Sequence, residues 1–324
     1  MSVENRAIDK ETASPAKRRI AAVDVLRGVA LIAMAIYHFS WDLEYFGYIE
    51  PGTVASGGWK LFARLIAGSF LFLAGFSLVL GNFPEIRARG FLIRLAKIVA
   101  AAAVITIATW FAFPDAFIFF GILHAIATAS VIGLLFLRLP PVVTLAVAAA
   151  VFIAPFYLRS PVFDAPALWW VGLSQMPMRS NDYVPLLPWL APFLAGLAAA
   201  RIALSTGFSN WLASFGMNGR VAGWLGFGGR HSLAVYLIHQ PLLIALVYLF
   251  SLGFPGTKPF ERSCVAACVA SQPEALCRAF CSCTTDKLMS QDLFKAFNAG
   301  EITNVDPRVT TITEQCTMDA QPKE

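Results

Sequence analysis

The first apolar stretch of the chain holds four ionisable side chains, Asp24, Arg27, His38 and Asp42. Ionisable residues inside a membrane span are rare and mark functional sites. Arg27 and His38 are eleven residues apart, so on an α-helix they face the same way, with about 16 Å between them along the axis. Asp42 follows His38 by four residues and can reach its imidazole, and Asp24 can likewise hold the Arg27 guanidinium. The spacing predicts a histidine general base oriented by an acid, with an arginine near the other end of the helix.

Each of these residues also has a simpler interpretation. Arg27 could extend only to the inner membrane interface, and His38 could be a packed or interfacial histidine. The shared helix face and the position of Asp42 favour the functional interpretation.

The elements that must position these side chains are membrane helices. Of the 324 residues, 57% are hydrophobic and 14% charged, and the mean hydropathy is +0.65. Soluble chains average roughly 45–50% apolar and about 25% charged residues, so the composition disfavours a nucleic-acid-binding protein, a cytosolic enzyme and a disordered chain. We predict an all-α polytopic bundle of about seven transmembrane helices in contact with membrane lipid. They are expected at about 22–42, 60–81, 92–113, 116–137, 140–158, 184–203 and 232–253.

The distribution of Lys and Arg predicts the orientation. A basic segment, residues 1–19, precedes the first span without a small-residue cleavage site, as in an uncleaved signal anchor. With this segment in the cytoplasm, most cations of the loops and span ends fall on the inner side, and the opposite loops and span ends hold only Lys60, Arg64, Arg159 and Arg179. We expect a plasma-membrane protein with three parts: a cytoplasmic segment (1–19), a transmembrane domain (20–253) and an extracytoplasmic tail (254–324).

All six cysteines lie in the hydrophilic tail, where an extracytoplasmic position would allow disulfides. Cys264 and Cys268, like Cys277 and Cys281, are four residues apart, which is typical of two short helices forming a hairpin with one cysteine pair on each facing surface. Six cysteines allow 15 connectivities. We favour Cys264 with Cys281, Cys268 with Cys277, and Cys283 with Cys316; a four-cysteine zinc site is the alternative.

Five motifs in order resemble a known family of membrane acyltransferases. They are Asp24-Val-Leu-Arg27-Gly28, Tyr37-His38-Phe-Ser-Trp41-Asp42-Leu, Phe120-Gly121-Ile-Leu-His124, Asp182-Tyr183 with Pro185-Leu-Leu-Pro188-Trp189, and Gly229-Arg230-His231-Ser232 with Tyr236-Leu-Ile-His239-Gln240-Pro241. The Arg27 to His38 spacing resembles acyltransferase-3 proteins. The wider pattern resembles bacterial relatives of the heparan-alpha-glucosaminide N-acetyltransferase catalytic domain. The likeness covers about residues 19–253 and leaves the cysteine tail unmatched.

The resemblance implies transfer of an acetyl or short acyl group from cytoplasmic acyl-CoA to a sugar amine or hydroxyl outside. His38 takes the place of the catalytic histidine, as a general base or a transient acyl carrier, and Arg27 takes that of its partner arginine. No metal is expected, and the acceptor glycan and the oligomeric state stay open. Further residues expected to bind the CoA moiety are Arg87, Arg89, Arg94, Lys97, Arg230 and His239.

Several of these assignments have structural alternatives. The basic residues around 87–97 could serve topology alone, and the glycine-rich entry before Arg230 could be only a tight turn. His124 is expected about 12 Å from the outer end of the fourth span, closer in depth to His38 than His239 is, and becomes the second catalytic candidate; a purely structural role is open for both histidines. Trp41 and Asp182 are the candidates for acceptor binding.

Two competing functions use the same features. A transporter or flippase could employ buried His, Arg and Asp side chains as a relay, although the span pattern shows no inverted repeat. A membrane-anchored sensor could use the cysteine tail as its active part.

Overall fold

The computed structural model describes residues 20–214 and 219–321, and every regular element within them is a helix. The basic segment 1–19, predicted to be cytoplasmic, lies outside the described residues. Each predicted apolar stretch contains one helix. These helices are α1 (Ala21–Tyr45), α2 (Gly57–Asn82), α3 (Ala88–Ala112), α4 (Ile122–Phe136), α5 (Pro141–Tyr157), α6 (Leu186–Ser205) and α9 (Ser232–Gly253).

Five of these helices, all except α4 and α5, are long and apolar enough to cross a membrane. α4 has 15 residues and α5 has 17, which at 1.5 Å per residue is short of a hydrocarbon core about 30 Å thick. The chain is therefore an integral membrane protein, and the count of seven crossings stays a prediction.

The fourth helix begins later than the sequence indicated. Pro114–Ala116 forms a short 3-10 helix (η1), residues 117–121 are not helical, and Gly121 is the N-cap of α4. The prediction of a continuous helix from 116 was wrong. Apolar residues such as those at 117–120 lengthen the hydrophobic run, but hydrophobicity alone does not make the backbone helical.

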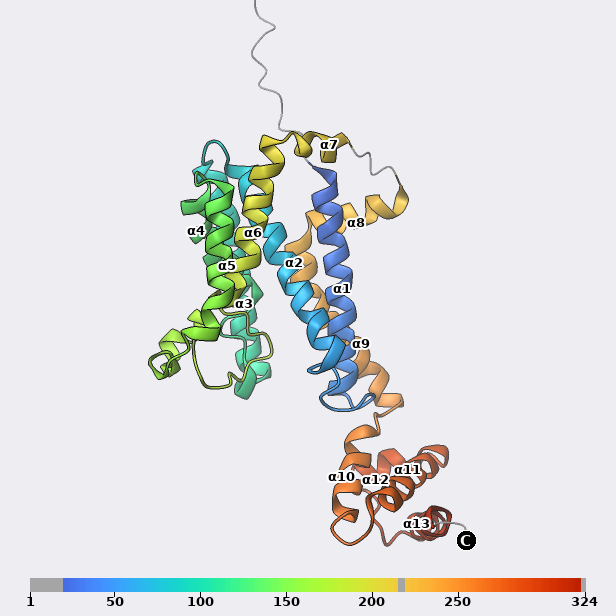
Figure 1. The fold of residues 1–324 in the computed structure, drawn as a ribbon. Coiled ribbons are helices and arrows are strands. Elements are labelled where there is room, and N and C mark those ends of the chain that lie inside the picture. The colour runs from blue at the N-terminus through green and yellow to red at the C-terminus, as the bar shows by residue number, and fades with distance from the viewer. Residues whose placement is uncertain (1–19, 215–218, 322–324) are drawn as a thin grey trace, which may run out of the picture. The chain divides into compact units, whose positions relative to one another are not determined.

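The chain divides into two compact units, and α1, α2 and α9 contribute residues to both. The first unit contains the chain up to Met34 and Ala63–Ile238. Within it α5 and α6 pack together, as do α3 with α4 and α4 with α6 (Figure 1). Its core centres on α6, where Phe193, Leu194 and Leu197 are fully buried. Short helices η2 (Pro161–Asp164), η3 (Pro166–Val171), α7 (Phe208–Ser214) and α8 (Arg220–Arg230) also belong to this unit.

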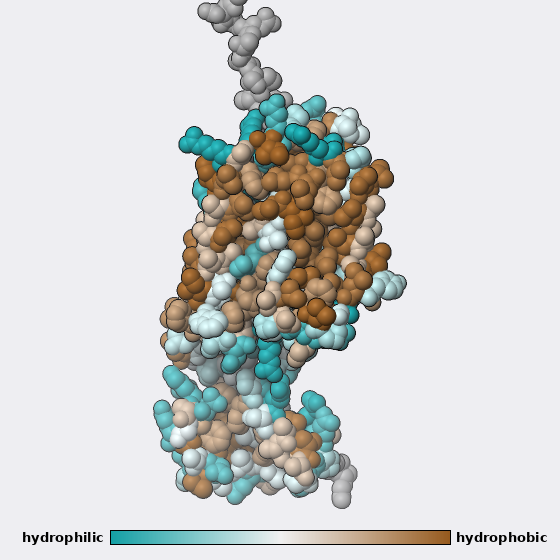
Figure 2. Space-filling view, turned by 90° about the vertical axis from the view of Figure 1, so that its left-hand side faces the viewer, coloured by the Kyte–Doolittle hydropathy of each residue, from teal (hydrophilic) through white to brown (hydrophobic). Residues whose placement is uncertain are grey.

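The outer surface of these helices is apolar, as Figure 2 shows for one face. Large side chains on α3, α4 and α5 are exposed by three quarters or more, namely Phe111, Leu135, Val142 and Phe156. A protein that exposes apolar side chains to this extent would tend to aggregate in water. This surface therefore suits a lipid environment.

The second unit contains Ala35–Phe62 and His239–Glu324. Its tail forms α10 (Lys258–Cys268), α11 (Glu274–Ser290), α12 (Phe294–Asn298) and α13 (Pro307–Ala320). A small apolar core in the tail contains Leu288, Phe294, Val309 and Ile312. The Lys258 N–H donates to the Gly47 carbonyl (3.0 Å), which joins the start of α10 to the turn after α1.

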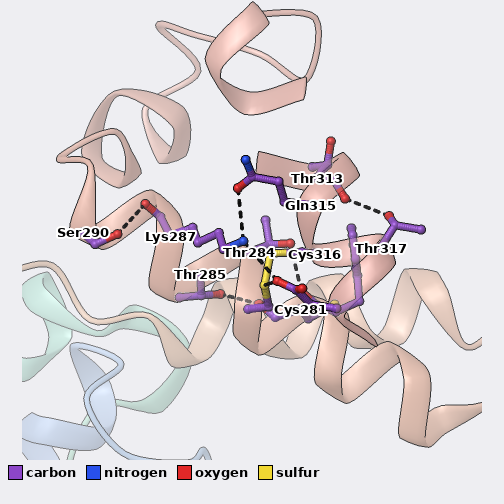
Figure 3. The surroundings of a disulfide bond; sticks show 12 residues. Cys281, Thr284, Thr285, Lys287, Ser290, Thr313, Gln315, Cys316 and Thr317 are labelled. Atoms are coloured by element: carbon purple, nitrogen blue, oxygen red, sulfur yellow. Dashed lines mark hydrogen bonds and ion pairs between the residues drawn. A yellow bond between two sulfur atoms is a disulfide. The ribbon is translucent and has the colours of Figure 1, made fainter. Parts of the chain in front are cut away.

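Three disulfides hold the tail together, in the predicted pairing. Cys264 bonds Cys281, Cys268 bonds Cys277, and Cys283 bonds Cys316, so no cysteine in the described part of the chain is free. α10 and α11 form the hairpin that the four-residue spacing indicated. Figure 3 shows Lys287 of α11 directed at Gln315 of α13, where the Nζ to Oε1 distance is 3.1 Å.

Candidate active site

A pair of histidines joins α1 to α9 within the second unit. The rings of His38 and His239 have centroids 5.0 Å apart and meet edge to face, and Tyr37 lies edge-on to His38 with a centroid distance of 5.8 Å. His38 and His239 are only partly exposed. Two imidazoles in contact between apolar helices provide nitrogens that can accept and donate protons. Packing of the two helices does not need such polar groups, so the pair marks a candidate functional site.

One helical turn beyond His38, Asp42 has a different partner from the one predicted. Its Oδ1 accepts a hydrogen bond from Gln240 Nε2 (2.7 Å), and no bond to His38 is formed. Asp42 is fully buried, and its Oδ2 has no hydrogen-bond partner in the described part of the chain. The prediction that Asp42 orients His38 was wrong, because a neighbouring helix offers the carboxylate a closer amide donor.

The relative depths predicted for the other histidines were also wrong. The predicted topology starts the last span at the inner membrane surface, which places His239 away from His38. Gly229 instead packs against the backbone at Asp24 and Gly28, where a Cβ would overlap the Asp24 carbonyl. The ring contact between His38 and His239 puts these two histidines at the same level of α1 and α9, whereas His124 lies at the start of α4.

His124 lies at the start of α4 and not deep within it. Its Nδ1 accepts a hydrogen bond from the Gly121 N–H (3.2 Å), and its Nε2 lies 3.3 Å from Thr106 Oγ1 of α3. As the third residue of α4 it satisfies a backbone donor that the helix leaves unpaired. Its geometry supports the structural alternative more than a second catalytic role.

Asp182 accepts a hydrogen bond from a backbone N–H at the same end of α4. Its Oδ2 accepts a hydrogen bond from the Ile122 N–H (2.9 Å). Burial raises the pKa of this loop carboxyl to about 6, although the hydrogen bond from Ile122 opposes the shift. The structure gives this acceptor-binding candidate a position at the N-terminus of α4.

Three of the predicted CoA-binding cations share one cavity in the first unit. Arg27, Arg94 and Lys97 line a space of about 330 Å³ whose other walls include apolar residues and Tyr236. Arg27 is held by Asp24 at 3.2 Å, as predicted, and by the Ser77 hydroxyl of α2. The cavity combines positive charge with an apolar wall.

The remaining predicted residues do not line this cavity. Arg87, at the N-cap of α3, and Arg89 are exposed. Arg230 is exposed at the end of α8, with its guanidinium 5.9 Å from the Phe227 ring centroid. Trp41 stacks on Tyr45 of the same helix, with ring centroids 5.3 Å apart.

Three residues at these sites had no role predicted for them from the sequence. Gln240 adjoins His239 in a motif already noted, and a polar amide inside an apolar span was the signal available. Tyr236 opens the same motif, and Ser77 is a single polar residue in a long apolar run, which carries no spacing signal. Among the described residues, no group of three or more His, Cys, Asp or Glu side chains is arranged to hold a metal ion.

Comparison with known proteins identifies one family. The family model described as heparan-alpha-glucosaminide N-acetyltransferase, catalytic, matches residues 19–241. No curated protein and no solved structure matches the chain significantly. The matched range includes His38 and His239, and it also includes the three cavity cations Arg27, Arg94 and Lys97.

Proposed function

Because the chain belongs to the family of the heparan-alpha-glucosaminide N-acetyltransferase catalytic domain, we propose that it transfers an acetyl or short acyl group from acyl-CoA to a sugar amine or hydroxyl. The donor is taken from the cytoplasm and the acceptor lies on the other side of the membrane. The observation that carries the proposal is the His38–His239 pair, which places a proton acceptor between two helices of the matched domain.

The donor side of the proposal rests on the basic cavity. The CoA moiety carries phosphates and an extended pantetheine arm. The three cations of the cavity suit the phosphates, and its apolar wall suits the arm. Asp24 and Ser77 hold the Arg27 side chain in place. Binding of a ligand therefore costs less side-chain conformational entropy than it would with a mobile arginine. Arg94 and Lys97 are exposed along α3 and supply further positive charge.

The transfer step needs a base. His38 accepts the proton of the attacking amine or hydroxyl as the new N–C or O–C bond forms, the thioester C–S bond breaks, and the proton passes to the leaving thiolate. His239, in ring contact with His38, positions the imidazole. The thioester supplies the activated acyl group.

The direct test is acetyl transfer from acetyl-CoA to glucosamine in proteoliposomes. We expect His38→Ala to lower kcat about 100-fold or more, the usual contribution of a general base. His231→Ala is the matched control, because His231 is exposed and bonds only its own helix turn. Wild-type turnover by His38→Ala would refute the mechanism.

A further inference from the structure

The short helix α8 has one buried side and one exposed side. Leu225, Gly226 and Gly229 follow the spacing of one helix face and are buried or half-buried. Trp224 and Phe227 lie on the opposite side, where they are 77% and 53% exposed. The exposed side of α8 therefore carries aromatic rings where a helix that faces water would carry polar side chains.

The buried side packs on α1 within the first unit. A Cβ at Gly229 would overlap the Asp24 carbonyl of α1, and a Cβ at Gly28 of α1 would overlap the Leu225 carbonyl. Small residues allow this close approach of the two backbones. α8 is thus attached to the turn of α1 that carries Arg27, and its aromatic side points away from α1.

The ends of the neighbouring helices place α8 at the membrane surface. α6 and α9 are both long and apolar enough to span a membrane, and they end at Ser205 and begin at Ser232. Only His231 separates α8 from α9, so α8 ends where a membrane helix begins. Tryptophan is enriched at this depth, because its ring suits both lipid and water.

Both ends of α8 are positively charged. Arg220 and Arg230 are its first and last residues, and both are exposed. No Asp or Glu occurs in the sequence between Asp182 and Glu261, so no acidic side chain on either flank of the helix offsets this charge. An aromatic face with an arginine at each end is complementary to an anionic lipid surface.

We propose that the exposed side of α8 binds anionic phospholipid, with Trp224 and Phe227 inserted among the lipids and Arg220 and Arg230 on the headgroup phosphates. Arginine can bind two phosphate oxygens at once. A zwitterionic lipid also has a phosphate, but its own ammonium group offsets the negative charge, so the anionic lipid binds more tightly. This lipid site does not depend on the acyl-transfer reaction.

Quenching of tryptophan fluorescence by brominated lipids measures the binding on the full chain in nanodiscs. The contribution of Trp224 is the difference between the wild type and Trp224→Phe. We expect brominated phosphatidylglycerol to quench Trp224 at a lower mole fraction than brominated phosphatidylcholine, by on the order of fivefold for each arginine. Equal quenching by the two lipids would overturn the proposal. Absence of quenching by either would also overturn it, since protein would then cover the aromatic side.

Substitution of both arginines assigns the preference to α8. The double variant Arg220→Gln, Arg230→Gln is expected to lose it, and Arg220→Lys, Arg230→Lys should keep most of it because the charge remains. Arg138→Gln is the matched control, since Arg138 is an exposed arginine in the turn between α4 and α5, outside α8. A preference that survives in the glutamine variant, or that falls equally in Arg138→Gln, would show that general surface charge attracts the lipid and would refute the assignment.

Discussion

At the scale of single residues, two loop carboxylates have opposite environments. Asp182 is partly buried and its pKa is raised to about 6 by burial. Asp164 accepts hydrogen bonds from the Ser174 hydroxyl and the Gln175 N–H, and these bonds lower its pKa. A raised pKa means that the folded state favours the protonated acid, so the stabilisation by Asp182 is complete below about pH 4 and is lost as the pH rises through about 6.

We therefore expect Asp182→Asn to be more stable than the wild type at pH 8, by on the order of 1–2 kcal/mol after allowance for partial exposure. Asparagine can still accept from the Ile122 N–H but has no charge to bury. Thermal unfolding in detergent from pH 4 to 8 measures the effect, and the difference should shrink towards pH 4.

Asp164→Asn serves as the comparison of opposite sign for this experiment. It should lose stability at pH 8, because the charged acceptor of two hydrogen bonds is removed. An Asp182→Asn variant less stable than the wild type at pH 8 would show that the charged helix-end contact outweighs burial.

At the scale of elements, glycines set how closely helices approach. A Cβ at Gly75 of α2 would overlap the Phe193 carbonyl of α6, and one at Gly196 of α6 would overlap the Phe72 carbonyl of α2. Small residues at such contacts allow close backbone packing between membrane helices. The contact also adjoins the fully buried Phe193 and Leu197.

Gly75→Ala is expected to destabilise the protein by about 1–3 kcal/mol, because a methyl group is forced into a closely packed contact. Gly68→Ala on the same helix is the matched control, since a Cβ there meets nothing within 4 Å. Reversible unfolding in mixed micelles compares the two, and equal stabilities would mean that α2 and α6 can separate without loss.

At the scale of the whole molecule, the number of crossings depends on the α4–α5 pair. If both helices cross the bilayer the count is seven, and if neither crosses it is five. Either odd count agrees with the predicted orientation, in which the two ends of the chain lie on opposite sides. We predict a cytoplasmic N-terminus, which would place the disulfide-bonded tail in the compartment where disulfides persist.

Site-directed labelling decides between seven and five crossings. Leu139, in the turn between α4 and α5, is 37% exposed. With seven crossings, Leu139→Cys reacts with an impermeant maleimide only from the cytoplasmic side. No native cysteine in the described part is free to interfere. Arg179→Cys, at an exposed loop position, is the control for the outer side. Labelling of Leu139→Cys from outside would reduce the count to five.

The sequence by itself determined what depends on local spacing. Apolar runs predicted the positions of the membrane helices, and the four-residue spacing of Cys264 and Cys268 and of Cys277 and Cys281 predicted a disulfide-bonded hairpin, because helical periodicity is fixed within a few residues of the chain.

Only the tertiary structure decided the partners between helices. Asp42 bonds Gln240, which is 198 positions away, and His38 contacts His239 rather than a neighbour on α1. The basic cavity gathers Arg27 from α1 with Arg94 and Lys97 from α3. Such partners depend on the depth and rotation at which helices pack, and close glycine contacts such as that of Gly229 with the Asp24 carbonyl are part of this packing. Spacing along one helix cannot contain that information.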